Sequence, residues 1–192
     1  MSAFVHLHLH TEYSLVDSVV RITSEGEGIP GLMDSVAAAK MPSVALTDQS
    51  NLFAMVKFYK AAQSAGVKPI IGVDLRVHET GERAEPSSLV LLCQTAVGYN
   101  NLSKLVSKSY LEGQKKGVAT VDRSWLNPED LKGLIALSGA REGDMGRAIL
   151  NGRFDEANNA LDFWLSLFAD RVYLELQRTG REGDVRHVQG AL

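Results

Sequence analysis

Three histidines alternate with leucines near the beginning of the chain, in the run His6-Leu7-His8-Leu9-His10. Alternate residues of an extended strand point to the same side, so the spacing predicts that His6, His8 and His10 share one face. Same-face neighbours lie about 6.5–7 Å apart along a strand, within reach of one metal ion or of two adjacent ions. Neutral imidazole is a common ligand of zinc, manganese and iron. The run therefore indicates a metal site, and the alternative is a half-exposed strand face without a ligand role.

Two aspartates lie at or within later apolar segments. Asp48 lies just after the apolar run 43–46. Barrel enzymes place catalytic groups at this position, the carboxyl end of a buried strand. The other interpretation is that Asp48 or Ser50 caps a helix beginning near Leu52. Asp74 lies inside the apolar run 69–77, where a carboxylate is costly unless it is paired or metal-bound. Asp74 is therefore a second candidate ligand, unless it faces solvent at a strand end.

Short apolar runs alternate with helix-type runs along the chain, which predicts βαβ units around a parallel sheet. Gly66 is typical of a helix end, and Asn127-Pro128 of a helix start. The stretch 23–28 is rich in glycine, and 78–86 is polar and typical of a surface loop. Neither a G-x-G-x-x-G nor a Walker-type phosphate loop is present, which favours a barrel with its site at strand ends. We expect strands at 4–9, 43–46, 69–77, 88–93, 134–137 and 172–176, and helices at 30–39, 52–65, 97–111, 144–150 and 155–168.

The composition is that of a globular protein. Of 192 residues, 45% are hydrophobic and 22% charged, which excludes a disordered tail or a fibrous repeat. A net charge of −3 argues against a domain that grips nucleic acid mainly by neutralising phosphates. The single cysteine, Cys93, lies in an apolar run, so we interpret it as a core residue in a reducing compartment. No apolar stretch is long enough for a membrane span, and we expect a cytoplasmic protein without a membrane partner.

The run from Phe4 to Asp17 (F-V-H-L-H-L-H-T-E-Y-S-L-V-D) resembles the opening of the PHP (polymerase and histidinol phosphatase) domain. It is similar to the form found at the N-terminus of bacterial DNA polymerase III alpha subunits. Six further segments agree in order and extend the resemblance over nearly the whole chain. They are A-L-T-D-Q-S-N-L-F (45–53), V-K-F-Y-K-A-A (56–62), K-P-I-I-G-V-D (68–74), G-Y-N-N-L (98–102), G-L-I-A-L-S-G (133–139) and Y-L-E-L-Q-R-T-G (173–180).

The resemblance implies the fold and the ligand set. The family fold is a distorted (β/α)7, TIM-like barrel with a metal cluster at the strand ends. We expect residues 1–192 to be one such domain, incomplete at the C-terminus, with the last strand and a last Asp-x-His motif beyond Leu192. The implied metal ligands are His8, His10, Asp17 and Asp74, with His6 and Asp48 near the site. Three family ligand positions hold residues of another type here, namely Gln49, Ser88 and Ala140.

These replacements predict a degenerate site that binds at most one Zn, Mn or Mg ion, weakly, and holds no catalytic residue. The resemblance implies a structural role in a DNA-directed DNA polymerase, a nucleotidyltransferase that requires Mg and whose active-site carboxylates lie outside this chain. The implied partners are the rest of the alpha chain, a separate proofreading exonuclease subunit, and DNA through the parent protein. The alternative is an active metal-dependent phosphoesterase or 3′–5′ exonuclease. A free-standing sugar or histidinol phosphatase fits less well, because segments 56–62 and 98–102 are polymerase-like.

Overall fold

The computed structural model describes residues 4–15, 17–24, 29–78, 85–115 and 117–192, and these form two compact units. The first unit comprises residues 1–73 and the second residues 74–192. Strand β2 (Lys68–His78) begins in the first unit and ends in the second. The predicted glycine-rich stretch 23–28 and polar loop 78–86 lie mostly outside the described residues.

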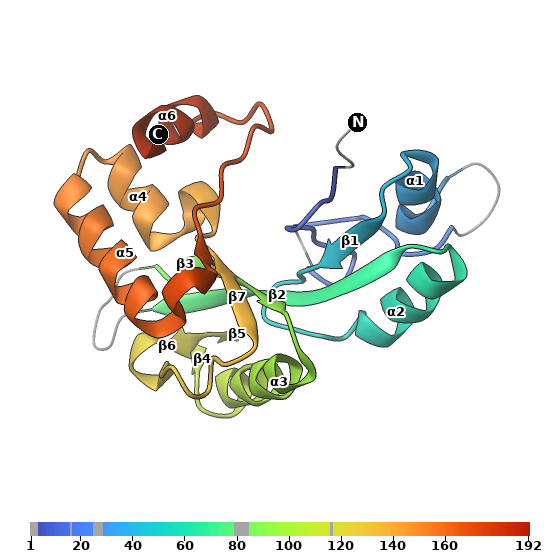
Figure 1. The fold of residues 1–192 in the computed structure, drawn as a ribbon, viewed down its shortest axis with the longest axis horizontal. Coiled ribbons are helices and arrows are strands. Elements are labelled where there is room, and N and C mark those ends of the chain that lie inside the picture. The colour runs from blue at the N-terminus through green and yellow to red at the C-terminus, as the bar shows by residue number, and fades with distance from the viewer. Residues whose placement is uncertain (1–3, 16, 25–28, 79–84, 116) are drawn as a thin grey trace. The chain divides into compact units, whose positions relative to one another are not determined.

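The first unit packs two helices and two strands around one apolar core (Figure 1). Helix α1 (Leu32–Ala38) precedes β1 (Ser43–Leu46), which pairs in parallel with the first residues of β2. Helix α2 (Met55–Ser64) ends as predicted at Gly66, whose φ of 69° is the left-handed conformation that glycine adopts without a Cβ penalty. The core residues include Ile22, Leu32, Met33, Val36, Val44, Leu46, Phe58 and Ala62.

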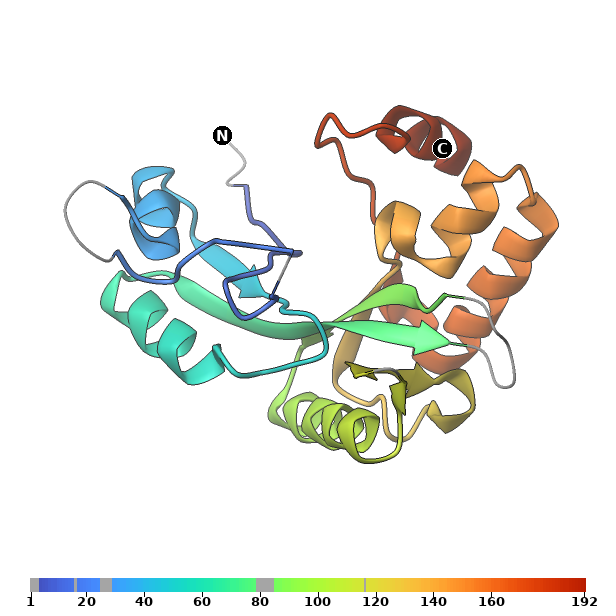
Figure 2. The ribbon, with the colours of Figure 1, turned by 180° about the vertical axis from the view of Figure 1, so that it is seen from behind.

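The second unit contains the rest of the sheet and four helices, of which α4, α5 and α6 lie side by side in both views (Figures 1 and 2). Its strands are the end of β2, β3 (Ser87–Cys93), β6 (Val121–Asp122), β7 (Leu134–Leu137) and β8 (Val172–Tyr173). A small two-stranded sheet joins β4 (Gln114–Lys115) to β5 (Val118–Ala119). The helices are α3 (Ala96–Leu111), α4 (Asp144–Leu150), α5 (Phe154–Phe168) and α6 (Asp184–Ala191), with 3-10 turns at Arg123–Trp125, Ala140–Glu142 and Ala169–Arg171.

The sheet is mixed rather than all-parallel, which corrects the predicted strand directions. β3 follows β2 in the sheet order, and β3 pairs antiparallel with β7, whereas β7–β8 and β2–β6 are parallel. The reason is connection length. Only eight residues separate His78 from Ser87, and a parallel crossover needs a dozen or more. Among the described residues β8 is an edge, so the α/β sheet is confirmed and it is not closed.

Two further local predictions are wrong. Residues 4–10 form no strand, and the backbone bends at Leu7 and His8. Asn127-Pro128 begins a series of turns instead of a helix. The capping hydrogen bond does form, since Asn127 Oδ1 accepts from the Asp130 amide at 3.0 Å, but the turns end at Gly133, whose φ is 75°, and β7 begins at the next residue. Helix α3 does carry its own cap, since Thr95 Oγ1 accepts a hydrogen bond from the Gly98 amide at 3.2 Å. Gly98 is required there because a Cβ would overlap the carbonyl of Gly133.

Candidate metal centre

The segment that carries the histidines lies beside strand β1. The Ala45 amide donates to the carbonyl of His6 at 2.8 Å, and the Thr47 amide donates to the carbonyl of Leu9 at 2.9 Å. Thr47 Oγ1 also accepts from the Leu9 amide at 2.8 Å and donates to the Leu9 carbonyl at 3.0 Å. Thr47, buried at the end of β1, thus fixes the backbone between the two later histidines.

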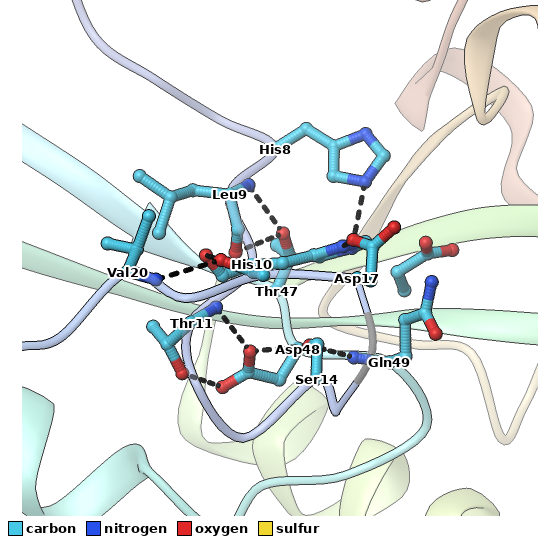
Figure 3. Close-up of polar contacts among 12 residues, drawn as sticks. His8, Leu9, His10, Thr11, Ser14, Asp17, Val20, Thr47, Asp48 and Gln49 are labelled. Carbon is cyan, nitrogen blue, oxygen red and sulfur yellow. Dashed lines mark hydrogen bonds and ion pairs between the residues drawn. The ribbon is translucent and has the colours of Figure 1, made fainter.

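His8 and His10 come together, as the spacing predicted, but His6 does not join them. The Nε2 atoms of His8 and His10 lie 3.3 Å apart, and both side chains are half-buried (Figure 3). His6 is exposed and packs edge-on against the ring of Phe4, with the two ring centres 4.8 Å apart. The bend at Leu7 and His8 interrupts the strict alternation of an extended strand, which is why the three imidazoles do not share a face.

Asp74 completes a group of three possible ligands. His8, His10 and Asp74 each offer one atom, and the three atoms lie within 4.8 Å of one another. Asp74 is buried on β2 and accepts a hydrogen bond from Ser88 Oγ at 2.5 Å. Bonds of about 2.0–2.1 Å to zinc at tetrahedral angles place two ligand atoms about 3.4 Å apart, close to the spacing of the two Nε2 atoms. Two imidazole nitrogens and one carboxylate oxygen therefore fit a divalent transition-metal ion.

Asp17 is paired with His10 on the side away from His8. Its carboxylate forms an ion pair and hydrogen bond with His10 Nδ1, and its side chain is 45% exposed. A carboxylate that accepts from Nδ1–H fixes the tautomer in which Nε2 carries the lone pair, and it orients the ring. The contact shows that Asp17 orients the His10 ring, and its expected role as a metal ligand stays a prediction.

Asp48 anchors the loop that follows His10 and is not a helix cap. It is 1% exposed, and it accepts hydrogen bonds from the Thr11 amide (2.6 Å), Thr11 Oγ1 (2.8 Å) and Ser14 Oγ (2.7 Å), as Figure 3 shows. Helix α2 begins seven residues later, at Met55, and its N-cap residue has no side-chain capping bond. The capping prediction is therefore wrong for Asp48. Thr11 and Ser14 were missed by the sequence reasoning, although hydroxyl residues directly after the histidine run were a visible signal.

Gln49, Ser88 and Ala140, which the resemblance places at family ligand positions, have the following surroundings. The backbone amide of Gln49 donates to Ser14 Oγ at 3.0 Å, and its carbonyl accepts from Asn51 Nδ2 at 2.9 Å. Ser88 is buried and occupies one oxygen of Asp74. Ala140 is buried with a φ of 47°, a conformation that non-glycine residues rarely adopt. A methyl group at this position offers no ligand atom.

The comparisons with known proteins identify the family of the chain. The model of the PHP domain matches residues 6–179. The chain belongs to the PHP domain family. Curated relatives are DNA polymerase III alpha subunits, from Pseudomonas aeruginosa (44% identical over 99% of this chain), Vibrio cholerae (41% over 98%) and Escherichia coli K12 (39% over 98%). In each case this PHP chain spans only 16% of the relative's length.

Solved structures show a more distant likeness to this PHP domain. An amidohydrolase from Chromobacterium violaceum superimposes with a TM-score of 0.42 at 20% identity, over 56% of this chain and 33% of that one. A structure from Bifidobacterium adolescentis, described as that of a metal-dependent phosphoesterase, superimposes with a TM-score of 0.39 at 11% identity. The match covers 57% of this chain and 34% of that one. Among the residues that the structure describes, no helix has the length and apolar character needed to cross a membrane.

Proposed function

We propose that the chain is the N-terminal PHP domain of a replicative DNA polymerase alpha subunit and serves DNA replication through that parent protein. The observation that carries this proposal is the alignment of nearly the whole chain, at 39–44% identity, with one short part of much longer alpha subunits. The parent activity would be DNA-directed DNA polymerisation, a Mg-dependent nucleotidyl transfer performed outside these residues. Sequencing the coding region beyond Leu192 tests it. We expect a continuation of roughly a thousand residues with the polymerase carboxylates, and a stop codon at that point would refute the proposal.

The proposed role of the domain is structural. It would support the rest of the alpha chain and dock a separate proofreading exonuclease subunit, with DNA contacted through the parent protein in the cytoplasm. The open edge at β8 supports a fold that becomes a TIM-like (β/α)7 barrel when further strands of the alpha chain are added, because unpaired strand edges are normally covered. A pull-down of the exonuclease subunit by the full alpha chain, with and without residues 1–192, tests the docking role. Equal recovery would contradict it.

The proposed metal site is degenerate. His8, His10 and Asp74 would hold one Zn, Mn or Mg ion weakly, and Asp17 would orient His10. An ion held here would polarise a phosphoryl oxygen and acidify a bound water. Phosphoesterases of the two-metal type hold ions about 3.5–4 Å apart, each with its own ligands. A group of three ligand atoms, with Gln49, Ser88 and Ala140 at the replaced positions, supports occupancy by a single ion and weak or no catalysis.

The alternative function is an active metal-dependent phosphoesterase or 3′–5′ exonuclease, and the convergence of His8, His10 and Asp74 is the observation that favours it. Plasma emission analysis of the purified chain, after dialysis against each metal, separates the two. We expect at most one ion per chain, lost in His8→Ala, and tighter binding in Gln49→His. Two or three stoichiometric ions, together with cleavage of a mismatched primer in Mn²⁺ that disappears in His10→Ala, would refute the degenerate site.

A further inference from the structure

The hydroxyl of Ser88 lies against the Asp74 carboxylate in the interior of the second unit. Ser88 Oγ donates a hydrogen bond to Asp74 Oδ1 at 2.5 Å, and the two residues are only 4% and 3% exposed. Asp74 lies on β2 and Ser88 on β3, which is the neighbour of β2 in the sheet. A serine hydroxyl has a single proton to donate, and that of Ser88 is donated to Asp74. The protein itself therefore engages one oxygen of this carboxylate.

The backbone that follows β7 packs directly on Ser88. Gly139 has a φ of 70°, and a Cβ built on it would lie 2.4 Å from the carbonyl oxygen of Ser88 and 2.8 Å from its Oγ. A Cβ on Gly143 would lie 3.2 Å from the same carbonyl oxygen. These distances leave no space for a further side chain beside the hydroxyl. Ser88 is thus confined by close packing as well as by its hydrogen bond to Asp74.

A carboxylate that accepts a hydrogen bond from a confined, buried donor is restricted as a metal ligand. Coordination through both oxygens would compete with Ser88 for Oδ1 and leave a buried hydroxyl without an acceptor, which is unfavourable. Coordination through a single oxygen keeps the hydrogen bond and fixes the orientation of the carboxylate. The contact therefore favours coordination of an ion by one oxygen of Asp74.

The number of oxygens that Asp74 supplies affects which ion the site prefers. His8, His10 and Asp74 offer one ligand atom each. Two imidazole nitrogens and one carboxylate oxygen, completed by a water, form the four-coordinate set of many catalytic zinc sites. Manganese is better suited by carboxylate and water oxygens in a six-coordinate set. A carboxylate limited to one oxygen therefore favours zinc, whereas a carboxylate that can use both oxygens is more favourable to manganese.

We infer that Ser88 is a positioning residue of the candidate metal centre, which limits Asp74 to one ligand oxygen and so makes the site selective for Zn²⁺ over Mn²⁺. The inference rests on the proposed metal site and adds a determinant of its specificity. Ser88 acts through Asp74 and is not itself a ligand in this arrangement, because its hydroxyl is engaged with the carboxylate. Hydrogen-bond partners of metal ligands typically change metal affinity by about 10–100-fold.

Ser88→Ala tests this role, and Ser87→Ala is the matched control. Ser87 precedes it in β3, and its Oγ donates to the carbonyl of Val77 at 3.2 Å instead of to Asp74. The affinities of the 192-residue chain for Zn²⁺ and Mn²⁺ are measured by competition with a chelator, and circular dichroism verifies the fold. Ser88→Ala should weaken Zn²⁺ binding about 10–100-fold and lower the ratio of Zn²⁺ to Mn²⁺ affinity about tenfold or more. Ser87→Ala should change either quantity by about twofold at most.

Cobalt(II) reports the coordination number, because its visible absorption bands are intense in four-coordinate sites and weak in six-coordinate ones. At saturating Co²⁺ we expect intense bands in the wild type and in Ser87→Ala, and weaker bands in Ser88→Ala. Equal Zn²⁺ affinity in the two serine variants, an unchanged Zn²⁺ to Mn²⁺ ratio or an unchanged cobalt spectrum in Ser88→Ala would overturn the inference and leave the metal site intact. If the wild type bound no Zn²⁺ up to about 1 mM, the proposed metal site and the inference would both be refuted.

Discussion

The carboxylate of Asp48 should be one of the main local determinants of stability in the first unit. We consider its replacement by alanine and by asparagine. The side chain is 1% exposed and accepts three hydrogen bonds, one of them from a backbone amide. The residues that donate them, Thr11 and Ser14, are themselves buried. Removing the carboxylate therefore leaves buried donors that water cannot reach. An unsatisfied buried donor costs more stability than the loss of a hydrogen bond at the surface.

The magnitude follows from the type of each donor. Hydrogen bonds to a charged group contribute about 1.5–3 kcal/mol each, and a buried unsatisfied donor costs about 1–3 kcal/mol. The hydroxyls of Thr11 and Ser14 can rotate toward other acceptors, whereas the Thr11 amide cannot. We therefore expect Asp48→Ala to lower the free energy of unfolding by about 3–5 kcal/mol. In Asp48→Asn one oxygen remains and the new amide can donate to Thr11 Oγ1, so the loss should be about 1–2 kcal/mol.

Urea denaturation followed by circular dichroism measures both free energies of unfolding. The comparison is valid when the dependence of free energy on urea concentration has the same slope in each variant. Asp17→Ala is the matched control, because it removes an exposed carboxylate from the same region and should change stability by under about 1 kcal/mol. If Asp48→Ala proved no more destabilising than Asp17→Ala, the hydrogen-bond network would not have the role assigned to it. Equal losses in Asp48→Ala and Asp48→Asn would also refute the reasoning, since they would trace the effect to charge alone.

Three other predictions concern Asp17, His187 and Cys93. Asp17→Asn should weaken binding of Zn²⁺ by about 10–100-fold in a chelator competition, because the carboxylate orients His10, and unchanged affinity would show that it does not. Burial lowers the pKa of His187, against the opposing charges of Asp184 and Glu175. Since its pKa is then lower in the folded than in the unfolded chain, stability should be complete above about pH 6.5 and fall as the pH drops below it. His187→Gln should flatten this dependence between about pH 7 and 5 in denaturation curves, and an unaltered pH profile would count against it. Burial raises the pKa of Cys93 to about 11, so little reactive thiolate is present in the folded chain. At about pH 8, iodoacetamide should therefore modify the folded chain about a hundredfold more slowly than the urea-unfolded chain. Equal rates would contradict this prediction.

The part of the site that the sequence predicted is the part set by local geometry. His8 and His10 are two residues apart, so any nearly extended backbone brings their side chains to one side. The position of His6 depends on a bend that the alternation of types conceals. Asp74 was recognisable as a buried carboxylate needing a partner, and Ser88 is one such partner.

Long-range contacts account for what the sequence did not reveal. The residues next to Asp48 in the chain favour a capping role, whereas the groups that donate to its carboxylate lie 34 and 37 residues earlier. By contrast, the ends of β1, β7 and α4 coincide with the predicted ranges, because apolar runs and glycines mark them in the sequence. The direction of β3 follows from the connection after His78, which is too short for the parallel crossover that alternating strands and helices predict.

The anchoring of the loop after His10 separates the folding of the first unit from metal binding. The bonds of Asp48 to Thr11 and Ser14 involve no side chain of the candidate ligands His8, His10 and Asp74. The contacts of Thr47 with Leu9 and of Asp17 with His10 likewise need no ion to form. The two histidines are therefore held in place by the protein itself, and a folded chain is no evidence that an ion is bound.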